Sequence, residues 1–132
     1  MKTRIEKYIP IAITIIRQGI GMNNMVAEEY DGYAASLGPA IIASGLLPAV
    51  SFYSDVHKAG SEDKPHRYEI LVIIAEILRT QENIDVNTEK NGLLVFLLNK
   101  TQAERESLKP LIMDAVVAIK LSLRNFNQDK SQ

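Results

Sequence analysis

The sequence has no cysteine, no tryptophan and only two histidines, and aromatic residues make up 6% of it. Without cysteine the chain can form no disulfide, no thiolate nucleophile and no cysteine-ligated zinc site. The formal net charge is only -1 at pH 7, so no strong overall field attracts nucleic acid or an anionic membrane. Binding to either would therefore depend on a local patch of charge.

The length and composition are typical of one globular domain. Of the 132 residues, 46% are hydrophobic and 23% charged, which is enough to bury a real core. The first residues place positive charges before an apolar run, as a signal peptide does. That run contains Pro10 and ends at Arg17 without a small-residue cleavage pattern, and no other uncharged segment is long enough to span a membrane. We therefore predict a single cytoplasmic domain over residues 1–132, without a membrane partner.

No sequence motif indicates catalysis. A P-loop, a nucleophile elbow and a paired-carboxylate signature are all missing. His57 and His66 flank a polar stretch with carboxylates nearby, but the spacing of a zinc-binding helix is missing, and two surface histidines at loop ends are the commoner case. We predict that the chain is not an enzyme and takes no metal, cofactor or small-molecule substrate. An enzyme that uses one of the two histidines is the weakest alternative.

Apolar residues recur at helical spacing along most of the chain. The first predicted helix covers residues 2–18, and the second starts between Met25 and Asp31 and ends at Ser44. A short helix then runs from Leu46 to Tyr53 or Val56, and two more cover residues 67–79 and 92–98. The last predicted helix follows a capping box at residues 101–104 and reaches Phe126. Residues 92–98 also have the length of a strand, but no second strand is predicted to pair with them, which favours a helix. Residues 67–79 are apolar almost all round and should form the most buried helix.

We therefore predict an all-α fold, a compact antiparallel bundle of about five to six helices. Pro10, Pro39 and Pro110 lie inside helical patterns, where each removes a backbone hydrogen bond and should kink or interrupt the helix. Gly45 is expected to end the second helix as its C-cap. The polar residues 127–132 are expected to fray.

The stretch from Tyr30 to Tyr53 contains two adjoining motifs. Residues 30–38 read YDGYAASLG, and residues 40–53 read AIIASGLLPAVSFY. This order of tyrosine, serine, small-residue turn, Ser-Gly-Leu-Leu-Pro and aromatic residue resembles the small all-helical subunit, the fifth Cmr protein, of the type III-B CRISPR Cmr effector complex. The residues that carry the resemblance are Tyr30, Tyr33, Ser36, Ser44, Gly45, Leu46, Leu47, Pro48 and Phe52. We interpret them as mainly structural, because tyrosines one turn apart usually pack inward; stacking on bases is the alternative.

The resemblance implies a non-catalytic, all-helical protein of RNA-guided antiviral defence. Small subunits of such complexes stack along the repeating backbone subunits and help to hold target RNA paired with guide RNA, while other subunits cut the RNA. The implied partners are other Cmr subunits, further copies of this chain, guide RNA and target RNA. A protein that holds RNA without reading its sequence contacts the phosphates. A chain with almost no net charge can do this only if its lysines and arginines are gathered in one strip.

Two helices provide candidates for this basic strip. They are Lys2, Arg4, Lys7 and Arg17 on the first helix and Lys109, Lys120 and Arg124 on the last. In an antiparallel bundle the two sets could adjoin, and for each residue a solvated charge without RNA contact is the alternative. The rival hypothesis for the whole chain is a helical protein–protein adaptor or regulator with no nucleic-acid role, which explains the same composition and lacks only the motif.

Overall fold

The computed structural model describes residues 1–55 and 64–129, and within them it contains six helices and two short strands. The helices are α1 (Arg4–Gln18), α2 (Glu29–Ser44), α3 (Leu46–Tyr53), α4 (Tyr68–Glu82), α5 (Gly92–Leu98) and α6 (Gln102–Leu123), and the strands are β1 (Met25–Ala27) and β2 (Asn127–Asp129). The all-α prediction is thus confirmed. The segment that could have been a strand, residues 92–98, is helical as expected.

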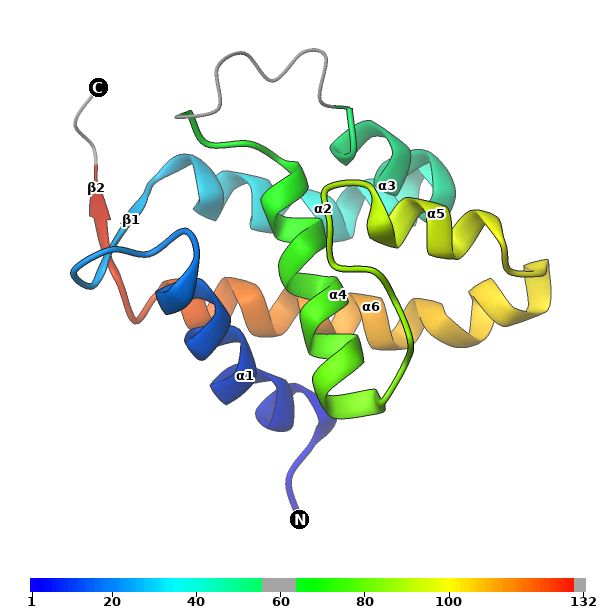
Figure 1. Ribbon diagram of the computed structural model, residues 1–132, viewed down its shortest axis with the longest axis horizontal. Helices are drawn as coiled ribbons and strands as arrows, with labels where there is room; N and C mark the ends of the chain where they lie inside the picture. Colours follow the sequence, from blue (N-terminus) through cyan, green and yellow to red (C-terminus); the bar gives the residue numbers. More distant parts are fainter. Residues whose placement is uncertain (56–63, 130–132) are drawn as a thin grey trace.

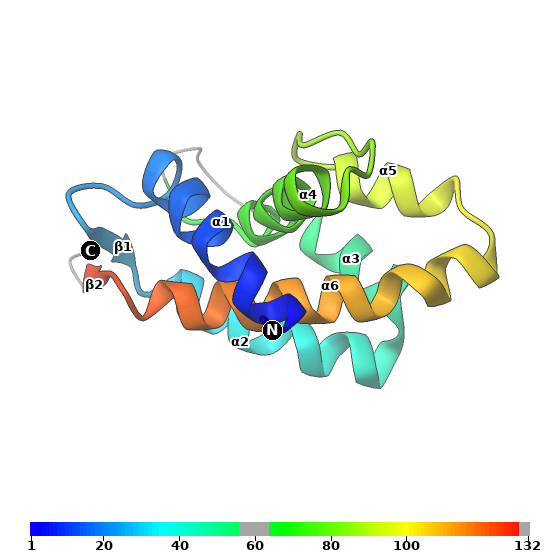
Figure 2. The ribbon, with the colours of Figure 1, turned by 90° about the horizontal axis from the view of Figure 1, so that it is seen from below.

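Helix α6 lies at the centre of the helix arrangement. Figure 2 shows α4 on one side of α6 and α2 on the other. Helices α2 and α6 run in opposite directions, whereas α4 crosses α6 (Figure 1). Helix α1 packs on α6 in the same direction, because Arg4 lies beside Asp114 and the Ile9 carbonyl lies beside Ser122 further along both helices. The bundle is therefore mixed in direction and not antiparallel throughout.

Helix α4 forms the centre of the hydrophobic core. Eight of its fifteen residues are buried, the highest share among the described helices, and Ile70, Ile74 and Leu78 have no exposed surface. It contacts α1, α3, α5 and α6, which explains why its sequence is apolar almost all round. The prediction that this helix is the most buried is confirmed. Neither α4 nor any other helix within the described residues is long and apolar enough to cross a membrane.

Caps determine where several helices begin and end. The predicted capping box starts α6: Thr101 Oγ1 accepts a hydrogen bond from the Glu104 backbone N–H at 3.1 Å, and the Glu104 carboxylate accepts one from the Thr101 N–H at 2.8 Å. A second box, formed by Thr3 and Glu6, starts α1. Gly45 ends α2 as expected, with a φ of 96° that favours glycine. This conformation lets the chain turn from α2 directly into α3.

None of the three helix prolines interrupts its helix. Helices α1, α2 and α6 continue through Pro10, Pro39 and Pro110, so the breaks that the sequence analysis allowed do not occur. All three prolines are exposed. A proline leaves the carbonyl four residues earlier without its helical donor. On an exposed face water can bond to that carbonyl, so the helix can continue.

The two short strands were not predicted. Strands β1 and β2 pair in parallel, with Met25 opposite Asn127 and Ala27 opposite Asp129. Phe126, which precedes β2, is buried against the core. The backbone of residues 127–129 is therefore paired where the sequence analysis expected fraying, because the ladder satisfies peptide groups that a free tail leaves to water. Residues 130–132 lie outside the described residues.

Candidate nucleic-acid interface

Helix α6 and its C-cap, Arg124, carry three of the predicted RNA-contacting residues on one side. At 3.6 residues per turn, Lys109, Lys120 and Arg124 project within roughly 60° of one another around the helix axis, and they span about 22 Å along it. Lys109 and Lys120 are half-buried and Arg124 is exposed. Long basic side chains in such positions cover apolar surface with their stems while the charged group stays in water. These residues can therefore present positive charge at separate points along this side of α6.

The four candidates on the first helix are exposed but differ in their surroundings. Lys2 precedes α1, and Lys7 and Arg17 face solvent along it. Arg4 Nη1 donates to Asp114 Oδ2 on α6 at 2.8 Å. Because this ion pair already gives Arg4 a carboxylate partner, a phosphate would have to compete with Asp114 for it.

The two sets of basic residues lie on different sides of α6. Asp114 marks the side on which α1 packs, and it is roughly 120° around the α6 axis from Lys120. On the other side, Gly38 of α2 lies against Met113 and Val116 of α6. Lys109 precedes that crossing and Lys120 follows it. The structure thus brings the three α6 candidates onto one face, on the α2 side, and does not join them to the α1 set.

Several motif residues hold α2, α3 and the start of α4 together. Tyr30 is buried and meets the Tyr33 ring edge-on, with 6.0 Å between centroids. The Tyr53 hydroxyl donates to the Tyr33 carbonyl at 2.7 Å and joins α3 to α2. The Arg67 guanidinium lies 5.2 Å from the Tyr33 centroid and 5.1 Å from that of Phe52. A cation of the chain itself therefore covers both rings.

The turn between α2 and α3 meets the start of α6 at a small cleft, which we call the motif cleft. Its volume is about 270 Å³, and it is lined by Gly45, Leu46, Leu47 and Pro48 of the motif and by Gln102, Arg105, Glu106 and Lys109 of α6. Leu46 is buried, whereas Ser36, Ser44 and Pro48 are exposed. No side chain caps the first turn of α3, so the backbone N–H groups of Leu46 and Leu47, two residues that line this cleft, have no intrahelical partner.

Arg105 is a basic residue of the motif cleft that the sequence analysis missed. It lies one turn before Lys109 on α6, and its Nε donates to the Leu97 carbonyl at the end of α5 at 2.9 Å. That bond uses one of the five N–H donors of the guanidinium. The spacing of Arg105 and Lys109 is visible in the sequence, but only the fold shows that the α2–α3 turn packs beside both of them.

His66 does not lie on the surface as the sequence analysis expected. It is 4% exposed and stacks on Tyr68, with 4.9 Å between ring centroids, because the chain enters α4 at this point. His57 lies outside the described residues. Among residues 1–55 and 64–129, no three His, Asp or Glu side chains are placed to hold a metal ion together.

Comparison with known protein families gives one match, a model of CRISPR-associated proteins named Cas_Cmr5, over residues 6–121. The chain belongs to the Cas_Cmr5 family. The resemblance that rested on residues 30–53 is thereby confirmed, and the match extends from α1 almost to the end of α6. Searches of curated proteins and of solved structures give no match.

Membership of the Cas_Cmr5 family makes the chain a subunit of a CRISPR-associated Cmr complex, which implies assembly with other subunits of that complex. The motif cleft lies entirely within the segment that the Cas_Cmr5 model matches, and so do Lys109 and Lys120. Arg124 lies just beyond its end.

Proposed function

We propose that this Cas_Cmr5 protein is a non-catalytic structural subunit of a type III-B Cmr complex, where it stacks along the backbone subunits and along copies of itself. There it helps to hold guide RNA and target RNA by contacting their phosphates. The observation that carries the proposal is the position of Lys109, which belongs both to the basic face of α6 and to the motif cleft. The stretch that resembles the family therefore meets one of the basic residues of α6 at the motif cleft.

The motif cleft has the chemistry of a phosphate site. Arg105 presents a planar fork of N–H donors, and Lys109 presents a compact positive charge. The first N–H groups of α3 lie at the positive end of that helix, where phosphate oxygens are favoured. Glu106 also lines the cleft but is exposed, so its carboxylate can remain in water. Contacts of these kinds position RNA without reading its sequence.

The test belongs in the assembled complex, because a chain with a net charge of -1 should bind RNA weakly alone. Lys120→Glu combined with Arg124→Glu should weaken target-RNA association of the reconstituted complex. If both residues contact phosphates, the slope of log affinity against log salt should become shallower by about 1.4. Fluorescence anisotropy of a labelled target RNA at several salt concentrations measures both quantities.

The matched control reverses two positive charges at positions outside α6. Lys64→Glu combined with Arg79→Glu alters two exposed cations that lie outside α6, and this variant should keep the wild-type affinity and salt slope. The content of this subunit in each purified complex must also be measured, because a loss of assembly would lower RNA binding indirectly. If both variants bind RNA equally at equal subunit content, Lys120 and Arg124 do not belong to the RNA interface.

A separate measurement distinguishes this proposal from the adaptor hypothesis. The tagged protein is recovered from its native cell extract with and without ribonuclease treatment. A multi-subunit assembly that carries short guide RNA supports the proposal. A single protein partner without RNA supports the adaptor.

A further inference from the structure

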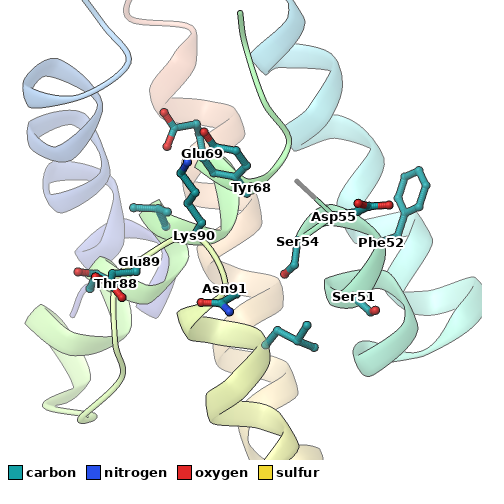
Figure 3. A pocket seen from close by; sticks show the side chains of 12 residues that line it. Ser51, Phe52, Ser54, Asp55, Tyr68, Glu69, Thr88, Glu89, Lys90 and Asn91 are labelled. Atoms are coloured by element: carbon teal, nitrogen blue, oxygen red, sulfur yellow. The ribbon is translucent and has the colours of Figure 1, made fainter. Parts of the chain in front are cut away.

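A second cavity lies on another part of the molecule, between the end of α3, the start of α4 and the start of α5. We call it the α3–α5 groove; its volume is about 990 Å³ (Figure 3). The charged residues that line it are Asp55, Glu69, Glu89 and Lys90. The described lining thus carries three carboxylates and one ammonium group, the opposite balance from the two cations and one carboxylate of the motif cleft. Phosphate is therefore disfavoured in this groove.

The groove also offers apolar surface. Val72 of α4 and Leu94 of α5 line it and are only half-buried, and the buried Tyr68 also belongs to its lining. Lys90 Nζ lies 5.2 Å from the Tyr68 ring centroid, so a cation of the chain itself already lies over this aromatic wall. A long side chain with an aliphatic stem and a positive end matches such a lining.

Ser54 provides an independent indication of a ligand. Its side chain lines the groove and points into it between α3 and Asn91 (Figure 3). The residue is 8% exposed, and its Oγ has no hydrogen-bond partner among the described residues. A buried hydroxyl without a partner is uncommon, because it has lost water without gaining another bond. A donor brought into the groove would supply that bond.

Glu69 is the least exposed of the three carboxylates that line the groove. It is half-buried at the start of α4. Burial raises the pKa of Glu69, and the nearby charges of His66 and Lys90 only partly oppose this effect. A further positive charge beside Glu69 would stabilise its ionised form.

We propose that the α3–α5 groove binds a lysine or arginine side chain from an extended segment of a partner protein. The stem of that side chain lies along Val72 and Leu94, its positive end lies near Glu69, and the Ser54 hydroxyl accepts one of its N–H groups. Charge complementarity selects this occupant over RNA. The inference does not depend on the RNA-contacting role of α6, because no residue is shared between the groove and that face.

The test uses the full chain and a synthetic probe, an acetylated pentapeptide with one central arginine among glycines and serines. Titration is followed in the amide NMR spectrum. Signals of Ser54, Glu69 and Leu94 should shift and saturate at roughly millimolar peptide. The same peptide with citrulline, which has the shape of arginine without its charge, should leave these signals unchanged.

Two variants locate the interaction. Glu69→Gln keeps the side-chain shape and should weaken peptide binding roughly tenfold, and Ser54→Ala should weaken it less. Glu28→Gln removes one exposed carboxylate far along the chain and should bind like the wild type. The proposal is overturned if the arginine peptide leaves the groove signals unchanged, if citrulline serves equally well, or if Glu69→Gln and Glu28→Gln bind alike.

Discussion

Helices α4 and α6 both hold α1, but through different kinds of polar contact. The Tyr8 hydroxyl of α1 donates to Glu82 Oε2 at the end of α4 at 2.7 Å, and Tyr8 has no exposed surface. Arg4 of α1 pairs with Asp114 of α6 at 2.8 Å, with 42% and 31% of the two side chains exposed. Water competes far more for the Arg4–Asp114 contact than for the Tyr8–Glu82 contact. We therefore expect the Tyr8–Glu82 hydrogen bond to contribute more to stability.

This difference distinguishes α4, which mainly stabilises the fold, from α6, which also carries the residues proposed for binding. Helix α4 has the largest buried share of the described helices, and its contact with Tyr8 is partly shielded from water. Helix α6 packs against α1, α2 and α4, and its Lys109 and Lys120 remain half-buried beside α2. Substitutions at the buried positions of α4 should therefore act on folding, and those at the basic residues of α6 should act on binding.

The largest effect is expected from Ile74→Asp at the middle of α4. Ile74 is fully buried, and an unpaired carboxylate there should cost more than about 4 kcal/mol, which is comparable to the stability of a small domain. Circular dichroism should show an unfolded or partly folded chain. Thr80→Asp on the exposed side of the same helix is the control and should remain folded. A stable Ile74→Asp variant would contradict the central position of α4.

A smaller loss is expected from Tyr8→Phe, which removes the shielded contact with α4. The half-buried Glu82 carboxylate loses its donor, so the free energy of unfolding should fall by roughly 1.5–3 kcal/mol. Urea unfolding at neutral pH measures this change. If Arg4→Gln cost more than Tyr8→Phe, the comparison between α4 and α6 would be reversed.

The same substitution has a signature at alkaline pH. Burial, together with the hydrogen bond to Glu82 and its charge, raises the pKa of Tyr8 well above its ordinary value of 10.0. The protonated hydroxyl thus stabilises the fold fully below pH 10.0, and this contribution is lost as the pH rises from there toward the folded-state pKa. Tyr8→Phe should show a smaller loss of stability than the wild type over that alkaline range.

The capping box of α6 should contribute less. Thr101→Ala removes the side chain that accepts the Glu104 N–H and should cost about 1 kcal/mol. Thermal unfolding followed by circular dichroism is sufficient to detect it. Thr14→Ala, at an exposed position within α1, is the control and should have little effect.

The smallest effect is expected from Arg4→Gln. The exposed ion pair with Asp114 should contribute at most about 1 kcal/mol, and salt should screen even that contribution. Urea unfolding of the variant and the wild type should therefore converge as sodium chloride is added. A large difference that persists at high salt would show that the contact is shielded like that of Tyr8.

The features that were predicted correctly depend on local signals. The apolar run that includes Ile74 predicted the central helix, the Thr101 capping box predicted the start of α6, and Gly45 predicted the end of α2. Each of these signals lies within a few residues of the structure that it determines.

The features that were missed depend on tertiary position. The tolerance of α2 for Pro39 follows from its exposed place on the helix, and the burial of His66 follows from its stacking on Tyr68. The motif cleft exists because the α2–α3 turn meets Arg105, far along the chain. The three-residue strands show no alternating pattern, and only their parallel pairing reveals them.

That pairing has a consequence for how the chain folds. Met25 and Asn127 are partners although about 100 positions separate them, so their contact closes a very long loop and brings a large entropic cost before it adds any stability. We expect it to form after the helices between them have packed. It should also open first: in hydrogen exchange, the amides of β2 should lose protection while those of α4 keep it. Strand β2 would then detach from β1 and rejoin it repeatedly beside a core that stays folded.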